Sequence, residues 1–194
     1  TEWLVTLYVL GLWMMRRRSW NALWLGSSGY LRLDLGFLLA AIIIGLLWLQ
    51  TRKILAKPKA IIHVRETMAF ADPLVPETRA DRRGFWLLSF TAGICEEIVF
   101  RGFLMWFIAA WTGPIAAVII SSIIFGLGHI YLGFAQVPRT ALVGLVLAVI
   151  VVASGSLWPA IVIHAALDLN SGELGFRVRH AAVTTSESAP SLMS

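Results

Sequence analysis

Six ionisable residues interrupt the apolar runs of this 194-residue chain, and their types are those used in acid–base catalysis. They occur in the stretches EEIVFR, FGLGHI and HAALD, and they are Glu96, Glu97, Arg101, His129, His164 and Asp168. On insertion scales, one charged residue at the centre of a membrane helix costs roughly 2.5–3.5 kcal/mol. Six such residues in apolar segments therefore indicate a functional site rather than tolerated polar positions.

The spacing of these residues predicts which side chains share a helix face. Glu97 and Arg101 are four residues apart, so they can pair along one helix and make a buried arginine tolerable. Glu96 is rotated from Glu97 by about 100° and is free to meet the two histidines. His164 and Asp168 are also four residues apart and can present one polar edge.

This set of side chains is suited to hydrolysis without a serine or cysteine nucleophile. A carboxylate paired with a histidine can activate a water molecule, and a second histidine can donate to the oxyanion that forms at a carbonyl. We expect Cys95, in apolar surroundings next to Glu96, to be an inert packing residue. Peptide hydrolysis by an activated water is the reaction that the pattern favours.

The composition predicts an all-α, polytopic integral membrane bundle. Hydrophobic residues make up 58% of the chain and charged residues 14%, whereas soluble domains average about 45–50% and about 25%. Apolar runs predict spans at residues 33–50, 85–111, 114–134, 140–152 and 157–169, a marginal one at 2–15 and an interfacial segment at 20–31. Because several runs are short, we expect about six to eight membrane helices.

Three parts of the chain follow from this segmentation. Residues 1–84 are predicted to hold N-terminal membrane helices and a polar, basic connector from 51 to 84. Residues 85–170 hold the candidate catalytic core. Residues 171–194 are a polar C-terminal tail, which from residue 177 has no apolar period and for which we expect no regular structure.

Basic residues predict the orientation in the membrane. If each later run crosses once, one side holds eleven lysines and arginines and the other holds four, so the richer side is predicted to be cytoplasmic. Glu96, His129 and His164 lie about 10–13 residues, or roughly 15–20 Å, from that flank. We therefore expect one cavity that opens toward the cytoplasmic side. The net charge of +5 lies beside apolar runs, which favours lipid head groups over nucleic acid.

The three motifs, in this order, resemble those of the CPBP intramembrane endopeptidases (CAAX protease and bacteriocin-processing proteins, also called the Abi family). This family includes the type II CAAX prenyl proteases, and the resemblance covers roughly residues 85–170. It implies a protease acting on a peptide or protein substrate at the membrane, such as a prenylated CAAX-type tail or a leader peptide.

The resemblance also implies roles for individual residues. Glu96 and His129 would activate water, and His164 with Asp168 would stabilise the oxyanion. The supporting residues would be Glu97, Arg101 and Phe125. The family's last motif often ends in Asn where this chain has Asp168, and an ionised aspartate can only accept hydrogen bonds. Asp168 would therefore be protonated or would orient His164, while Asn170 is close by in sequence.

Alternatives use the same residues. Glu96, His129 and His164 could instead ligate a catalytic zinc ion, although we favour a reaction without cofactors because the side chains suffice for the acid–base work. A non-enzymatic immunity or scaffold protein of the same fold is the rival from another class. A proton-relaying transporter is a third, but its usual inverted repeat is not visible.

Overall fold

The computed structural model describes residues 2–26, 29–68 and 75–187, and within these ranges the fold is helical, with no β-strand. The all-α prediction is thereby confirmed. The elements are α1 (Glu2–Met15), η1 (Trp20–Leu23), α2 (Tyr30–Leu55), α3 (Pro58–Met68), α4 (Arg79–Glu96), η3 (Glu97–Leu104), α5 (Met105–Thr112), α6 (Pro114–Gly128), η4 (Ile130–Leu132), η5 (Phe134–Gln136), α7 (Val137–Ser154) and α8 (Trp158–Glu187).

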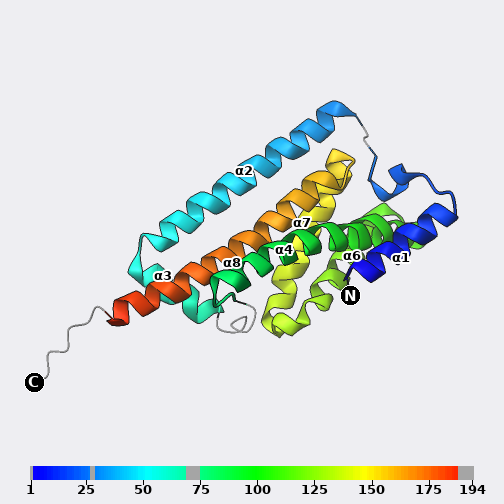
Figure 1. The fold of residues 1–194 in the computed structure, drawn as a ribbon. Helices are drawn as coiled ribbons and strands as arrows, with labels where there is room; N and C mark the ends of the chain where they lie inside the picture. Colours follow the sequence, from blue (N-terminus) through cyan, green and yellow to red (C-terminus); the bar gives the residue numbers. More distant parts are fainter. Residues whose placement is uncertain (1, 27–28, 69–74, 188–194) are drawn as a thin grey trace, which may run out of the picture.

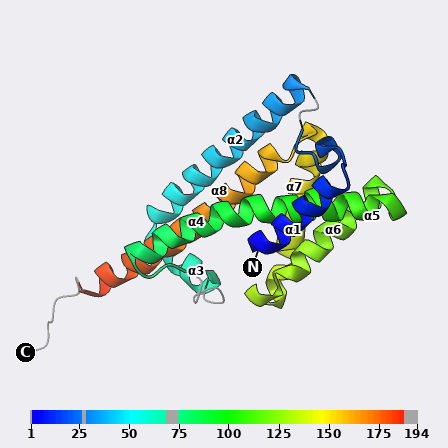
Figure 2. The same ribbon diagram turned by 45° about the vertical axis from the view of Figure 1, so that its right-hand side comes forward.

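Two long helical segments form the frame on which the other helices pack (Figure 1). The first consists of α4, η3 and α5, which follow one another without a break from Arg79 to Thr112. The second is α8, which packs along α4 on one side and along α2 on the other. The antiparallel pair α6 and α7 lies against this frame, and α1 lies across α4 and η3 (Figure 2).

Small residues allow the helices that carry the ionisable groups to approach closely. A Cβ atom added at Gly93 of α4 would lie 3.0 Å from the Cβ of Ala165 in α8. One added at Gly126 of α6 would lie 2.7 Å from the Cβ of Ala141 in α7. The core around these contacts is formed by buried apolar residues, including Ala117, Leu147, Ala148, Val151, Leu157 and Ala160.

Three segment boundaries differ from the sequence prediction. The α6 helix ends at Gly128 rather than near residue 134, and short 3-10 turns follow. The connector at 51–84 is largely helical, since it contains α3 and the adjoining ends of α2 and α4. Finally, α8 continues to Glu187, so the expectation of no regular structure from residue 177 was wrong up to that point. Residues 188–194 lie outside the described residues.

Charged side chains explain why α8 continues beyond its apolar part. Glu173 pairs with Arg177 one turn later at 2.6 Å and with Arg82 of α4 at 2.9 Å. Beyond them, Arg179 pairs with Glu77 at 2.8 Å. These contacts join the polar end of α8 to α4 and to the segment that precedes it, and they add side-chain pairing to the packing of Val178, which is 3% exposed.

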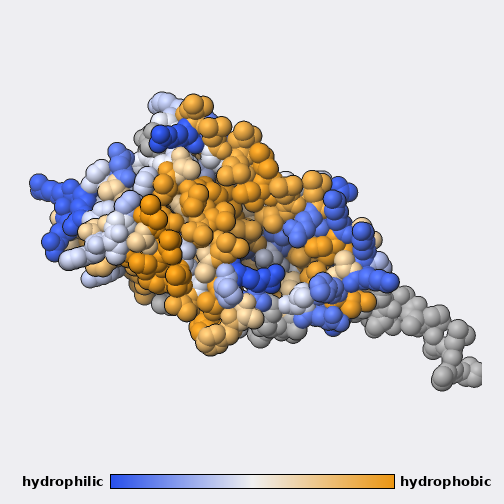
Figure 3. Space-filling view, turned by 180° about the vertical axis from the view of Figure 1, so that it is seen from behind, coloured by the Kyte–Doolittle hydropathy of each residue, from blue (hydrophilic) through white to orange (hydrophobic). Residues whose placement is uncertain are grey.

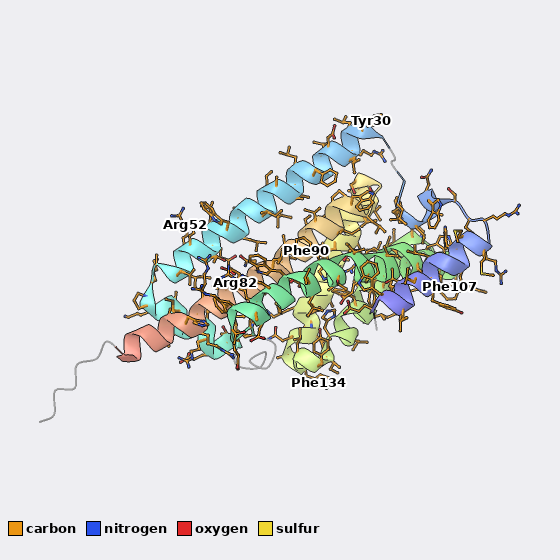
Figure 4. All side chains as sticks on the ribbon, in the orientation of Figure 1. Tyr30, Arg52, Arg82, Phe90, Phe107 and Phe134 are labelled. Carbon is orange, nitrogen blue, oxygen red and sulfur yellow. The ribbon has the colours of Figure 1, made fainter. Side chains whose placement is uncertain are left out.

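The surface of the bundle is unusually apolar. Leucines, isoleucines and aromatic residues of α2, α6 and α7 are exposed, and Figure 3 shows an apolar band with hydrophilic residues gathered at either end of the molecule. Among the described residues, two helical segments are long and apolar enough to cross a membrane, Tyr30–Leu55 and Phe134–Ser154. Figure 4 shows Tyr30 and Arg52 near opposite ends of α2.

Candidate active site

The predicted site residues come together where the junction of α4 and η3 meets the end of α6 and the first part of α8. The Oε2 atom of Glu96 lies 3.6 Å from Nε2 of His129 and 4.0 Å from Nε2 of His164. The same Nε2 atom of His164 lies 3.8 Å from Oδ2 of Asp168, one helical turn further along α8. Three separate helices therefore direct polar atoms toward one point.

Glu97 occupies the buried side of this site and binds two cationic or donor groups with one oxygen. Its Oε1 atom accepts hydrogen bonds from Nη1 of Arg101 and from Nδ1 of His164, each at 2.8 Å. The side chains of Glu97 and Arg101 are 0% and 1% exposed. Nη2 of Arg101 also donates to the backbone carbonyl of Gly144 in α7, at 3.2 Å. Helices η3, α7 and α8 are thus connected through one buried ion pair.

The segment that carries this ion pair is a π-helix rather than an α-helix. The α-helical hydrogen bonding of α4 ends at Glu96, and η3 runs from Glu97 to Leu104. Such π-helical turns are rare and occur frequently at functional sites. The change of helix type falls between the two glutamates, so Glu97 faces the buried ion pair while Glu96 faces the histidines.

His129 is held at the end of its helix. This residue is the C-cap of α6, and its Nδ1 atom lies 2.9 Å from the backbone carbonyl of Phe125, one turn earlier. A carbonyl can only accept, so Nδ1 carries a proton in this contact. The carbonyl is one of those that the end of a helix leaves without an intrahelical partner. The contact fixes the imidazole with Nε2 toward Glu96.

Phe125 packs against each of the groups that must keep their orientation. The guanidinium carbon of Arg101 lies 4.0 Å from the centre of its ring. The rings of His129 and His164 lie 4.6 Å and 5.7 Å from it, centre to centre. Phe100 of η3 contacts its other side edge-on. The side chain is 2% exposed, so it forms the apolar wall between the two histidines.

A cavity of about 380 Å³ adjoins Glu96 and His129. Besides these two residues, it is lined by Glu2, Val5, Thr6, Cys95, Val99, Phe100, Gly128 and Tyr131. Its walls therefore come from α1, α4, η3 and the turn after α6. The cavity is large enough for part of a peptide, and it places such a ligand beside the Oε2 atom of Glu96.

The described part of the chain contains no group of three His, Cys, Asp or Glu side chains arranged so that it could hold a metal ion. Zinc ligands in proteins are His nitrogens or carboxylate oxygens about 2.0–2.2 Å from the ion. The zinc alternative with Glu96, His129 and His164 as ligands stays a prediction, and no step below depends on a metal.

All the residues named from the sequence lie at this site, but several of their contacts could not be read from it. The bond between Glu97 and His164, the carbonyl of Gly144 and the π-helix depend on tertiary structure. Asn170 faces away from the site, since its Oδ1 accepts from Thr51 of α2 at 2.8 Å. Glu2 and Thr6 were missed, although two polar residues four apart in an apolar run were a usable signal.

Comparison with protein families gives one match. Residues 82–170 match the family described as type II CAAX prenyl endopeptidase Rce1-like. No curated protein and no solved structure matches the chain. The matched residues begin in the first turns of α4 and end at Asn170 in α8, so they include the three motifs and every group of the candidate site outside α1. Over residues 82–170, this chain is therefore similar to the Rce1-like type II CAAX prenyl endopeptidases.

Proposed function

We propose that this protein is an intramembrane endopeptidase that hydrolyses a peptide bond with a water molecule activated by Glu96 and His129. The observation that carries the proposal is the convergence of three polar atoms. Oε2 of Glu96 is buried without a hydrogen-bond partner among the described residues, and it lies 3.6 Å and 4.0 Å from the Nε2 atoms of the two histidines. Distances of this size allow a water molecule to bridge the groups.

Glu96 and His129 act on the attacking water. Because Nδ1 of His129 donates to the carbonyl of Phe125, Nε2 of the neutral ring is a lone pair facing the water. The carboxylate of Glu96 accepts one proton as the water oxygen bonds to the carbonyl carbon of the substrate. The proton is then delivered to the leaving nitrogen as the carbon–nitrogen bond breaks, which yields a carboxylic acid and an amine.

His164 acts on the developing oxyanion. Its Nδ1–H is fixed by Oε1 of Glu97, and a proton on Nε2 can then be donated to the oxyanion. Glu97 carries negative charge for both His164 and Arg101, which favours this cationic form of His164. Oδ2 of Asp168 lies 3.8 Å from Nε2, so its role is to attract a cationic His164 and orient the ring rather than to donate a hydrogen bond itself.

Under this proposal, the protein crosses the membrane several times. The exposed apolar residues of α2, α6 and α7 and the family's membrane character support this arrangement, with the site opening toward the cytoplasmic side. The family supports a protein or peptide substrate, for which we propose a prenylated CAAX-type tail, with a leader peptide as the second class. The surrounding lipid bilayer is the other partner.

The test is cleavage of a farnesylated CAAX peptide by purified wild type and Glu96→Gln, each with and without a strong chelator. We expect wild-type cleavage to persist with the chelator, and Glu96→Gln to lose roughly 10²- to 10⁴-fold in rate. Glu66→Gln, at an exposed position of α3, is the matched control and should cleave like wild type.

Other outcomes separate the alternatives. Loss of activity on chelation with rescue by Zn²⁺ would make Glu96 and the histidines ligands instead of acid–base groups. Equal rates for wild type and Glu96→Gln would contradict the mechanism. Binding of the peptide without cleavage by any variant would favour the non-enzymatic scaffold.

A further inference from the structure

The α1 helix brings a second set of polar atoms to the cavity beside Glu96. Glu2 and Thr6 are four residues apart on α1, and both line this cavity. Oε2 of Glu2 and Oγ1 of Thr6 are buried and have no hydrogen-bond partner that the described residues supply. Thr6 is 0% exposed, and its hydroxyl contacts the thiol of Cys95, which is a weak donor and acceptor and leaves most of its hydrogen-bonding capacity unused.

Unpartnered buried polar atoms are uncommon and each is costly. The structure leaves three of them at one cavity, namely Oε2 of Glu2, Oγ1 of Thr6 and Oε2 of Glu96. The chemistry of Glu96 explains its own free atom. It does not explain the two on α1, whose burial without hydrogen-bond partners costs free energy that apolar side chains would not cost. A ligand that supplies hydrogen-bond donors accounts for both.

The charge of the cavity specifies the ligand further. Among the described residues, its lining contains two carboxylates, Glu2 and Glu96, and no lysine or arginine. A buried carboxylate without a cation is unfavourable, and a cation arriving with the substrate would supply the missing charge. A substrate carboxylate would be repelled at the same place. The free hydroxyl of Thr6 adds a neutral acceptor one helical turn away.

We propose that Glu2 and Thr6 form a specificity subsite that binds a lysine or arginine side chain of the substrate, next to the peptide bond at Glu96. This inference rests on the proposed function for its substrate class. It assigns to α1, which lies outside the residues matched by the family, the choice of sequence around the cleaved bond. Glu2 and Thr6 bind substrate without taking part in bond breaking.

The test measures binding and cleavage separately. Three farnesylated CAAX peptides carry Lys, Gln or Glu immediately before the cysteine, and a parallel set has a non-hydrolysable ketomethylene in place of the peptide bond that follows the cysteine. Fluorescence anisotropy with the second set gives dissociation constants for wild type, Glu2→Gln, Glu2→Lys and Thr6→Val. Glu66→Gln, at an exposed position of α3, is the control for loss of a glutamate charge.

We expect wild type to bind the Lys peptide roughly tenfold more tightly than the Glu peptide, because the carboxylate of Glu2 attracts a positive side chain and repels a negative one. Glu2→Gln should abolish most of this preference, Glu2→Lys should invert it, and Thr6→Val should reduce it. Equal binding of the three peptides by wild type, or an unchanged preference in Glu2→Gln, would overturn the inference. Since these results do not require turnover, a failure of the protease proposal is seen separately, as absence of cleavage of the first set.

Discussion

On one side of the candidate site, around Glu97, the groups meet at hydrogen-bond distances, whereas on the other side, around Glu96, they stand further apart. Oε1 of Glu97 has two partners at 2.8 Å, and its side chain is 0% exposed. Oε2 of Glu96 has its nearest histidine nitrogens at 3.6 Å and 4.0 Å, and its side chain is 18% exposed. Two glutamates adjacent in sequence therefore have opposite environments.

This difference separates positioning from reaction. Oε1 of Glu97 is held by both Arg101 and His164 and the side chain is 0% exposed, so Glu97 serves as a fixed anchor, although its Oε2 has no hydrogen-bond partner among the described residues. A carboxylate whose oxygen faces two histidine nitrogens beside a cavity can bind and deprotonate water, as proposed for Glu96. The imidazole of His164 joins the two sides, with Nδ1 on the anchored side and Nε2 on the open one.

The largest expected difference between the two glutamates is in their contribution to stability, and it is tested by neutralising each in turn. Glu97→Gln leaves Arg101 and His164 without their anion, and we expect it to lower the free energy of unfolding by about 3–5 kcal/mol. Glu96→Gln removes no hydrogen bond of Oε2, so its loss of stability should be about 1 kcal/mol or less. Unfolding of the detergent-solubilised variants by SDS, followed by tryptophan fluorescence, measures both.

Equal losses of stability in the two variants would show that the glutamates are structurally equivalent and would contradict the division of the site. The rate of peptide cleavage should show the opposite order, with the larger loss expected where the loss of stability is smaller. Glu96→Gln should retain the wild-type stability and lose cleavage, whereas residual folded Glu97→Gln should still bind peptide with a misplaced His164.

A smaller effect is expected from the packing that holds His129 on the open side. In Gly126→Ala, the new Cβ would lie 2.7 Å from both the carbonyl oxygen of Val137 and the Cβ of Ala141, so α6 must move away from α7. We expect a loss of about 1–3 kcal/mol in stability from this overpacking. Gly128→Ala is the matched control, because its nearest neighbour, in the ring of Phe100, is 3.9 Å away. A similar loss in both variants would show that the contact with α7 is not the cause, because alanine favours a helix more than glycine does.

The sequence sufficed to predict which ionisable residues share a helix face, because helix periodicity and the cost of charge in apolar surroundings are local properties. The pairing of Glu97 with Arg101 follows from their spacing of four, and the structure has it at 2.8 Å. The turn of Glu96 toward the histidines also follows from helical rotation. These inferences needed no knowledge of how the helices pack.

What could not be predicted depends on contacts between distant segments. The sharing of Glu97 by His164 requires α4 and α8 to approach at Gly93, which a sequence pattern does not determine. The π-helix needs no special residue type, and the helical continuation of α8 past residue 177 depends on ion pairs with Arg82 and Glu77. The ends of elements were the least predictable part for this reason.

The α8 helix has one face toward the candidate site and another toward α2, and the two faces can be compared in the same way. Asp168 faces the open side, while Asn170, two residues later, accepts from Thr51 of α2. Thr51→Val leaves the amide oxygen without this donor, and we expect a loss of about 1 kcal/mol with cleavage unchanged. Thr112→Val is the control, because its hydroxyl bonds only backbone carbonyls at an exposed position and should have a smaller effect. Reduced cleavage in Thr51→Val at full stability would mean that α2 positions the site through α8.

The smallest effect is expected at the start of α4, the helix that leads to both glutamates. The hydroxyl of Thr78 and then its backbone N–H donate to the carboxylate of Asp81, and these bonds lower the pKa of Asp81 below its ordinary value. A carboxylate with a lowered pKa in the folded state stabilises the fold fully above its unfolded pKa, and it loses that contribution as the pH falls through the folded pKa. Asp81→Asn should therefore melt below wild type near neutral pH, and the two melting temperatures should converge in the acid range, below the ordinary pKa of an aspartate. Cleavage near neutral pH should be equal in the two proteins, because the capping box lies outside the site and sets where α4 begins rather than how Glu96 is oriented. A melting difference that stayed constant down to the lowest pH would show that the cap acts through hydrogen-bond geometry alone, without the charge of Asp81.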